Sequence, residues 1–334
     1  MTDQAVRPYL RTPTVSPDGD QIAFVSRGDI WLADSAGGRA ERLTEHSASH
    51  WHPRFAPDGS ALAFTSRRQG TGDVYILPLD DGQLQQITFH EGYAAVEDWA
   101  SDGQAIYCSS YRERIGSALY VVSTAATTPV PLYAEPHEQL RYLSAAPDGQ
   151  TLAFVNMRDS WWRRGPNPYA PSEIWLGPTR PDPTQLRKLI GSGSANGNPA
   201  LAAPYAGRNC WPLWAADGQG LYFVSDRDGV ENLWFQPLDG GAPHQITTFR
   251  DGRLLFPAIA RQSGLIVFER TGQLWRVQPG AEPEPIALRL GRDRKYAMKH
   301  TVEWSRSFSE LALAPDGKKL GLCGARRDLR RFRR

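Results

Sequence analysis

The side chains that could do chemistry are scattered along the chain, and few of them share a useful spacing. His50-Trp51-His52 places two imidazoles on one face of a strand, where they could hold a metal ion. No third ligand is evident beside them, so we expect a rim or solvent position instead. The other histidines are distributed over the chain: His46, His90, His137, His244 and His300. Nothing in their spacing supports a Ser/His/Asp triad, and a glycosidase-type pair of carboxylates is equally unsupported.

The motifs that usually mark an active site are absent from the sequence. It contains no Gly-x-Ser-x-Gly elbow, no HExxH pair and no phosphate-binding Walker loop. We therefore expect no catalytic residue, no cofactor site and no metal site in this chain.

The best candidates for contact with another molecule lie in an insertion at 157–171. It carries Trp161, Trp162, Arg163 and Arg164. Two indoles and two guanidinium groups on one loop can hold a peptide or a neighbouring domain. The alternative is a loop folded back onto its own sheet. A second insertion, rich in Gly, Ser, Ala and Asn, covers 191–209.

The elements that must position these residues are repeated. A Pro-Asp-Gly turn suits a hairpin, because Pro fixes φ and Gly takes the left-handed position. Complete or degenerate copies, each followed by an apolar stretch, are Ser16-Pro17-Asp18-Gly19, Ala56-Pro57-Asp58-Gly59, Ala100-Ser101-Asp102-Gly103, Ala146-Pro147-Asp148-Gly149, Ala216-Asp217-Gly218, Gln262-Ser263-Gly264 and Ala314-Pro315-Asp316-Gly317. The recurring aspartates are expected to be structural.

Two further signatures complete the repeated unit. An aliphatic-aromatic pair ends in Trp31, Tyr75, Tyr120, Trp175, Trp234 or Trp275, and a Gly-rich turn then precedes segments such as Arg42-Leu43-Thr44. One unit therefore has four strands joined by tight turns. Six units predict an all-β, six-bladed β-propeller of four-stranded antiparallel blades over residues 8–290. The six aromatic residues are expected to pack between blades.

Composition limits the partners and the compartment. The net charge is only +2, and three cysteines, Cys108, Cys210 and Cys323, show no CxxC spacing. The first residues carry neither a basic segment nor an apolar one. We expect a cytoplasmic protein with no nucleic-acid partner and no membrane contact, and leave oligomerisation open.

The C-terminal part repeats the pattern and then loses it. Residues 295–320 are predicted to be the first strands of a truncated second propeller. The tail, 321–334, is basic: positions 326–334 hold six Arg and one Asp. A single inserted base in codons for the repeat-like sequence LAFVARGEIFAASA reproduces the residues from Leu320 onward. We hypothesise that 321–334 is an aberrant, frameshifted tail of a longer protein. An uninterrupted reading frame at this locus, with no propeller-coding sequence downstream, would refute it.

The repeats Ser-Pro-Asp-Gly, Ile-Ala-Phe, Ile-Trp, Gly-Gly and Leu-Thr resemble TolB-like and WD40-like propeller repeats. The order of parts is similar to the tricorn protease family of S41-class serine peptidases. The resemblance rests on a propeller from the N-terminus, a Trp-Trp-Arg-Arg-Gly insertion in blade four, and Phe308-Ser309-Glu310-Leu311 opening a second propeller. It implies a non-catalytic segment that gates or channels peptides, with peptides or downstream domains as partners.

The sequence is compatible with three alternative functions. The first is the accessory propeller of a tricorn-like peptidase, whose catalytic residues would lie downstream. The second is a stand-alone TolB-like module that binds a protein or peptide. The third is the propeller half of a prolyl-oligopeptidase-type enzyme. The family's basic anchor for a substrate carboxylate is expected before the third-blade turn, where Phe89-His90-Glu91-Gly92-Tyr93-Ala94 offers no Arg pair.

Overall fold

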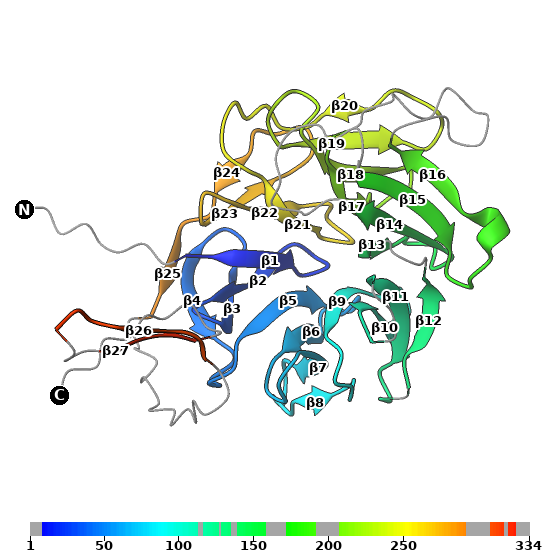
Figure 1. Cartoon of the computed structure of the whole chain (residues 1–334). Helices are drawn as coiled ribbons and strands as arrows, with labels where there is room; N and C mark the ends of the chain where they lie inside the picture. Colours follow the sequence, from blue (N-terminus) through cyan, green and yellow to red (C-terminus); the bar gives the residue numbers. More distant parts are fainter. Residues whose placement is uncertain are drawn as a thin grey trace, which may run out of the picture. The chain divides into compact units, whose positions relative to one another are not determined.

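The computed structural model describes residues 9–112, 116–126, 128–134, 139–157, 172–191, 207–291, 308–316 and 320–324. The chain divides into two compact units, 1–291 and 292–334. The first unit is an all-β, six-bladed propeller of antiparallel sheets, as the repeats predict (Figure 1). The one helical element among the described residues is a single 3₁₀ turn, η1 (Pro183–Gln185).

Each blade is a consecutive run of four strands. Blade 1 contains β1 (Arg11–Val15), β2 (Gln21–Ser26), β3 (Asp29–Asp34) and β4 (Gly38–Arg42). Blade 2 contains β5 (His50–Phe55), β6 (Ala61–Ser66), β7 (Asp73–Pro78) and β8 (Gln85–Gln86), and blade 3 contains β9 (Ala94–Trp99), β10 (Ala105–Ser110), β11 (Ala118–Ser123) and β12 (Val130–Tyr133). Blade 4 contains β13 (Leu140–Ala145), β14 (Thr151–Met157), β15 (Ser172–Pro178) and β16 (Arg187–Ile190). Blade 5 contains β17 (Asn209–Trp214), β18 (Gly220–Ser225), β19 (Asn232–Pro237) and β20 (His244–Gln245), and blade 6 contains β21 (Leu255–Ile259), β22 (Ile266–Arg270), β23 (Gln273–Val277) and β24 (Glu284–Pro285).

The first strand of every blade faces the axis of the ring. These inner strands, β1, β5, β9, β13, β17 and β21, contact one another in that circular order, and β21 contacts β1. Blades 3 and 6 therefore stand opposite each other across the axis. A further strand, β25 (Leu288–Leu290), pairs in parallel with β4 on the outer edge of blade 1 (Figure 1).

The Asp-Gly turns join the first and second strands of the blades, at one face of the ring that we call the turn face. In blades 1 to 5 the Asp carboxylate accepts the backbone N–H two residues later, for example Asp18 from Asp20 and Asp58 from Ser60, both at 3.0 Å. The glycine that follows takes positive φ, as at Gly19 and Gly59. The turn aspartates are therefore structural, because they satisfy donors that the strands leave open.

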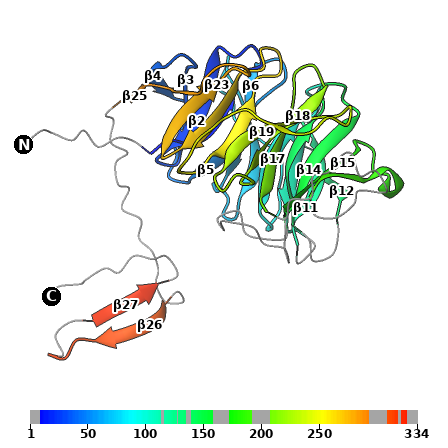
Figure 2. The same cartoon turned by 90° about the horizontal axis from the view of Figure 1, so that it is seen from above.

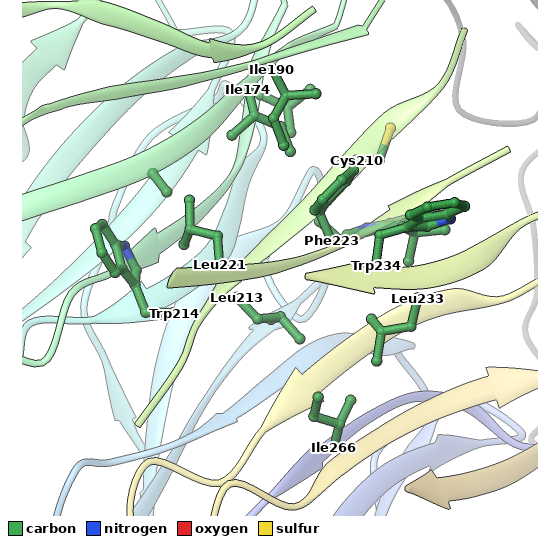
Figure 3. Close-up of a cluster of buried hydrophobic side chains, with 14 of the residues drawn as sticks. Ile174, Ile190, Cys210, Leu213, Trp214, Leu221, Phe223, Leu233, Trp234 and Ile266 are labelled. Atoms are coloured by element: carbon green, nitrogen blue, oxygen red, sulfur yellow. The ribbon is translucent and has the colours of Figure 1, made fainter. Parts of the chain in front are cut away.

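The core lies between neighbouring blades. One cluster joins blades 4, 5 and 6, and Figure 3 shows it with Ile174 of blade 4, Phe223 of blade 5 and Ile266 of blade 6. The other clusters join blades 2 and 3, blades 1 and 6, blades 3 and 4, and blades 1 and 2. Figure 2, turned by 90° from Figure 1, shows the sheets of neighbouring blades packed beside one another. Of the six aromatic residues on the third strands, four are buried, while Trp175 and Trp275 are half-buried.

The second unit contributes one antiparallel hairpin among its described residues. It pairs β26 (Phe308–Leu313) with β27 (Leu320–Gly324). The last four residues of β27 belong to the segment that lacks the sequence repeat.

Candidate functional site

The predicted contact residues Trp161, Trp162, Arg163 and Arg164 lie outside the described residues. The structure does fix their point of insertion. Strand β14 ends at Met157 and β15 begins at Ser172. The insertion therefore joins the second and third strands of blade 4, at the face of the ring away from the Asp-Gly turns.

The expectation of a rim or solvent position is wrong for His50, whereas His52 is half-buried. His50 is fully buried, and its Nδ1 lies 3.0 Å from the hydroxyl of Ser66. A β-bulge between Trp51 and Arg54 breaks the alternation of the strand, and the ring of His52 lies 6.0 Å from that of Phe256 in blade 6. The bulge, which adds a residue to the strand, gives the imidazoles different surroundings.

The same bulge recurs on five of the six inner strands. At each one a non-glycine residue takes positive φ: Thr12, His52, Tyr142, Trp211 and Phe256, with φ between 44° and 54°. This conformation is rare for such residues and is often found at binding sites. The sequence carried one signal that was missed, because four of the five directly precede a proline.

Four of these bulge residues meet around the axis, and we call them the aromatic constriction: His52, Tyr142, Trp211 and Phe256. Tyr142 and Trp211 have ring centroids 5.1 Å apart, and Trp211 and Phe256 have theirs 5.3 Å apart. His52 then contacts Phe256, although blade 1 separates their blades along the ring. The side chains therefore narrow the channel from four different blades.

Polar atoms at the constriction are left without partners. Trp211 is 3% exposed, and its indole Nε1 has no hydrogen-bond acceptor within the described part of the chain. The hydroxyl of Thr12, at the equivalent position of blade 1, is likewise buried and unpaired there. Buried groups of this kind cost about 1–3 kcal/mol each, so they call for an explanation.

A layer of charged residues lies closer to the turn face. A cavity of about 240 Å³ is bordered by Tyr142 and Trp211 and by residues of the Asp-Gly turns. Its charged lining residues are Arg54, Glu97, Asp98 and Arg261. Arg54 donates to the carbonyl oxygen of Glu97 at 2.9 Å.

The charged layer contains an ion pair that spans the axis. Arg261 of blade 6 donates from Nη2 to Asp98 Oδ1 of blade 3 at 2.8 Å and to the carbonyl oxygen of Trp99 at 3.0 Å. Asp98 and Arg261 thus connect opposite blades across the turn-face end of the channel.

Burial controls the protonation of the groups beside this pair. It raises the pKa of Glu97, whose carboxylate accepts from the Ser109 hydroxyl at 2.6 Å; this bond and the charges of Arg141 and Arg54 limit the rise. Burial also lowers the pKa of His52 to about 3, with Arg54, Arg141 and Arg11 adding repulsion. At neutral pH the imidazole is therefore uncharged.

This arrangement suits binding better than catalysis. Ser66 and His50 contact each other as two members of a triad would, but both are fully buried, so no substrate reaches the hydroxyl. Cys108 and Cys210 are free and buried, and burial raises both thiol pKa values to about 12, which disfavours the nucleophilic thiolate. The described residues contain no group of three or more His, Cys, Asp or Glu suited to a metal ion. None of the helices in that part of the chain is long and apolar enough to cross a membrane.

Comparison with known proteins places this propeller among relatives. Tricorn protease homolog 1 of Streptomyces coelicolor is 30% identical over 324 residues, which cover 95% of this chain and 28% of that protein. The crystal structure of the tricorn protease superposes with a TM-score of 0.68 at 19% identity, covering 94% of this chain and 29% of that one. The structure of the putative TolB of Agrobacterium tumefaciens superposes with a TM-score of 0.58 at 19% identity, covering 74% of this chain and 83% of that one. Both structures support the fold alone.

The chain thus spans less than a third of the length of these tricorn relatives. The model of the family described as "Tricorn protease N-terminal beta propeller domain" matches residues 7–283, nearly the whole ring. The chain therefore belongs to the family of tricorn protease N-terminal β-propeller domains.

Proposed function

We propose that this chain is the non-catalytic propeller segment of a tricorn-like serine peptidase of the cytoplasm, and that it binds peptides in its axial channel and so gates their passage. Peptidase activity would belong to downstream domains, and the hairpin β26–β27 would begin a second propeller. Support comes from the much longer tricorn relatives and from the axial geometry.

The unpaired indole of Trp211 is the observation that carries this proposal. Its N–H donor is buried at the aromatic constriction, between the rings of Tyr142 and Phe256. A peptide carbonyl would satisfy this donor, and the aromatic rings would cover apolar side chains. Positive φ at the bulge residues is consistent with backbone strain retained for binding.

The test measures binding and cleavage of a fluorescein-labelled, unstructured peptide by the full chain. We expect reversible binding, seen as increased fluorescence anisotropy, and no cleavage by mass spectrometry. Trp211→Phe keeps the aromatic contact but removes the donor, so it should weaken binding several-fold. The matched control Trp175→Phe, on the third strand of blade 4, should leave affinity unchanged. Peptide cleavage by the purified chain, or equal affinity in both variants, would contradict the proposal.

A stand-alone TolB-like module remains the second candidate. Its specific support is that the match to the putative TolB covers 83% of that chain, whereas the tricorn match covers 29%. A module of this type would bind a protein or peptide without downstream peptidase domains. Sequencing the DNA that adjoins the coding region therefore separates the two candidates, because only the tricorn-like segment requires codons for peptidase domains downstream.

A further inference from the structure

Arg261 occupies a turn position where other blades carry a small or rigid residue. The equivalent positions in blades 1, 2 and 4 are Pro17, Pro57 and Pro147, and all of them border the axial cavity. In blade 6 the backbone N–H of Gln262 still bonds the carbonyl oxygen of Pro17, so the turn keeps its place beside blade 1. The arginine thus lies in a turn of a different type, because the N–H of Gly264 bonds the carbonyl oxygen of Ala260 four residues back, whereas the turn glycines of blades 1 to 5 bond three residues back.

Asp98 is the fixed member of the ion pair. Its Oδ1 accepts the backbone N–H of Trp99 at 2.9 Å, and its Oδ2 accepts the backbone N–H of Ala145 in blade 4 at 2.9 Å. The carboxylate would therefore keep two backbone donors if the guanidinium moved away. Such donors hold the carboxylate in position.

Arg261 is held less firmly than Asp98. Its side chain is 24% exposed, and both of its hydrogen bonds across the axis come from a single nitrogen, Nη2. A long arginine side chain can leave such a site by rotating about its own bonds, without disturbing the backbone of the turn.

Withdrawal of Arg261 would change the charge of the cavity. Its charged lining would then be Glu97, Asp98 and Arg54, two acids against one base. Trp214 also borders the cavity and offers an indole surface to a cation or to its aliphatic stem. Arg141 and Arg54 counter the charge of Glu97, whereas Asp98 would lose its ion pair with Arg261, so the carboxylate of Asp98 is the group that complements a positive ligand.

We propose that Asp98, with the carbonyl oxygen of Trp99, is a binding site for a positively charged group of a peptide, and that Arg261 is its internal occupant. The ligand group is an N-terminal ammonium or the side chain of Lys or Arg. A peptide enters from the turn face by displacing Arg261, so the ion pair acts as a self-inhibiting latch. The inference rests on the proposed function for the ligand being a peptide.

The test compares Arg261→Ala with the wild-type chain by calorimetric titration. The probe is acetyl-Ala-Ala-Arg-Ala-Ala-amide, and the neutral probe has Gln in place of Arg. If the wild-type site is open about a tenth of the time or less, removing the latch tightens binding by at least tenfold. We expect this gain for the Arg peptide alone. Arg276→Ala removes a pair with Glu284 on the outer strands of blade 6 and should change neither affinity.

Two further measurements locate the site. Asp98→Asn in the Arg261→Ala background should abolish the gain, provided circular dichroism shows a folded chain. Independently of that variant, a peptide with Lys in place of Arg should be coupled by carbodiimide to Asp98 of the Arg261→Ala chain, and mass spectrometry should find the adduct there.

Several results would overturn the inference. One is an Arg261→Ala chain that binds the Arg peptide no more tightly than wild type, or binds both probes equally. Another is coupling of the Lys peptide only to other carboxylates. If peptides still bind at the aromatic constriction without charge preference, the result supports the proposed function but contradicts the Asp98–Arg261 latch. If no variant binds any peptide, both fail.

Discussion

His52 is a histidine kept neutral inside a channel that contains several arginines. Its pKa, lowered to about 3 by burial first and by Arg54, Arg141 and Arg11 next, lies far below the ordinary value near 6.5. Between these values the unfolded chain binds a proton that the folded chain does not. Stability is therefore lost as the pH falls below about 6.5.

We predict that His52→Gln removes part of this acid sensitivity. Each pH unit within the interval costs up to about 1.4 kcal/mol per such group, so between pH 6.5 and 5 the wild type should lose about 1.6 kcal/mol more than the variant. Urea unfolding at a series of pH values measures the difference. His244→Gln, at an exposed position of β20, is the control and should keep the wild-type slope. Parallel curves for wild type and His52→Gln would refute the assignment.

At the residue scale the turn aspartates were predictable and the channel residues were not. Asp18 and Asp58 each accept a hydrogen bond from the backbone two residues later, so their structural role follows from the local sequence. Trp211 and Phe256 come from different blades, and the bulge that redirects each one depends on pairing with the next strand. A repeated residue-proline step was the only trace of this in the sequence.

At the scale of elements, buried threonines extend the hydrogen bonding at the fourth strands of blades 1, 2 and 5. The backbone N–H groups of Ile30, Val74 and Leu233 each donate to a threonine hydroxyl at 2.9 Å, from Thr44, Thr88 and Thr247 respectively. In blade 5 that hydroxyl donates in turn to Asn232 at 2.9 Å. The hydroxyl therefore extends the hydrogen bonding of the sheet beyond the two residues of β20.

We predict that Thr247→Val destabilises the propeller by about 1–3 kcal/mol, because it leaves the buried N–H of Leu233 without its acceptor. Equilibrium unfolding in urea gives the value. The matched control is Thr248→Val, since Thr248 is exposed one residue later and should shift stability by less than about 0.5 kcal/mol. Equal effects of the two substitutions would show that the hydroxyl of Thr247 is dispensable.

The repeated Leu-Thr and Ile-Thr steps were visible in the sequence, so the fourth strands were located. The hydrogen bonds that these threonines make could not be predicted, because the partners of Thr44 and Thr88 lie on the preceding strand. Blade 4 ends in Lys188-Leu189 and blade 6 in Pro285-Ile286, without the threonine. The threonine of this sequence signature is therefore not common to all blades.

At the scale of the whole ring, six repeats were enough to predict six blades. The contacts that close the ring between the first and last blades were not predicted. The backbone N–H of Leu10 bonds the carbonyl oxygen of Gly272, and β25 adds a parallel strand to blade 1. Neither Leu288–Leu290 nor the Asp98–Arg261 pair follows the repeat, since both depend on blades that are distant in sequence. The sequence repeat predicts the strands and turns that all blades have in common. It does not predict the axial site, because the residues there differ from blade to blade.

The central claim is that the axial channel binds peptides from the turn face. Photo-crosslinking tests it most directly, with a peptide that carries a benzophenone side chain and the intact chain as target. Mass spectrometry of the digested product then identifies the labelled residues. We predict adducts on the inner strands β9, β13 and β17 and on the Asp-Gly turns that border the cavity. Adducts confined to the outer strands, or to the insertion at 157–171, would contradict the account.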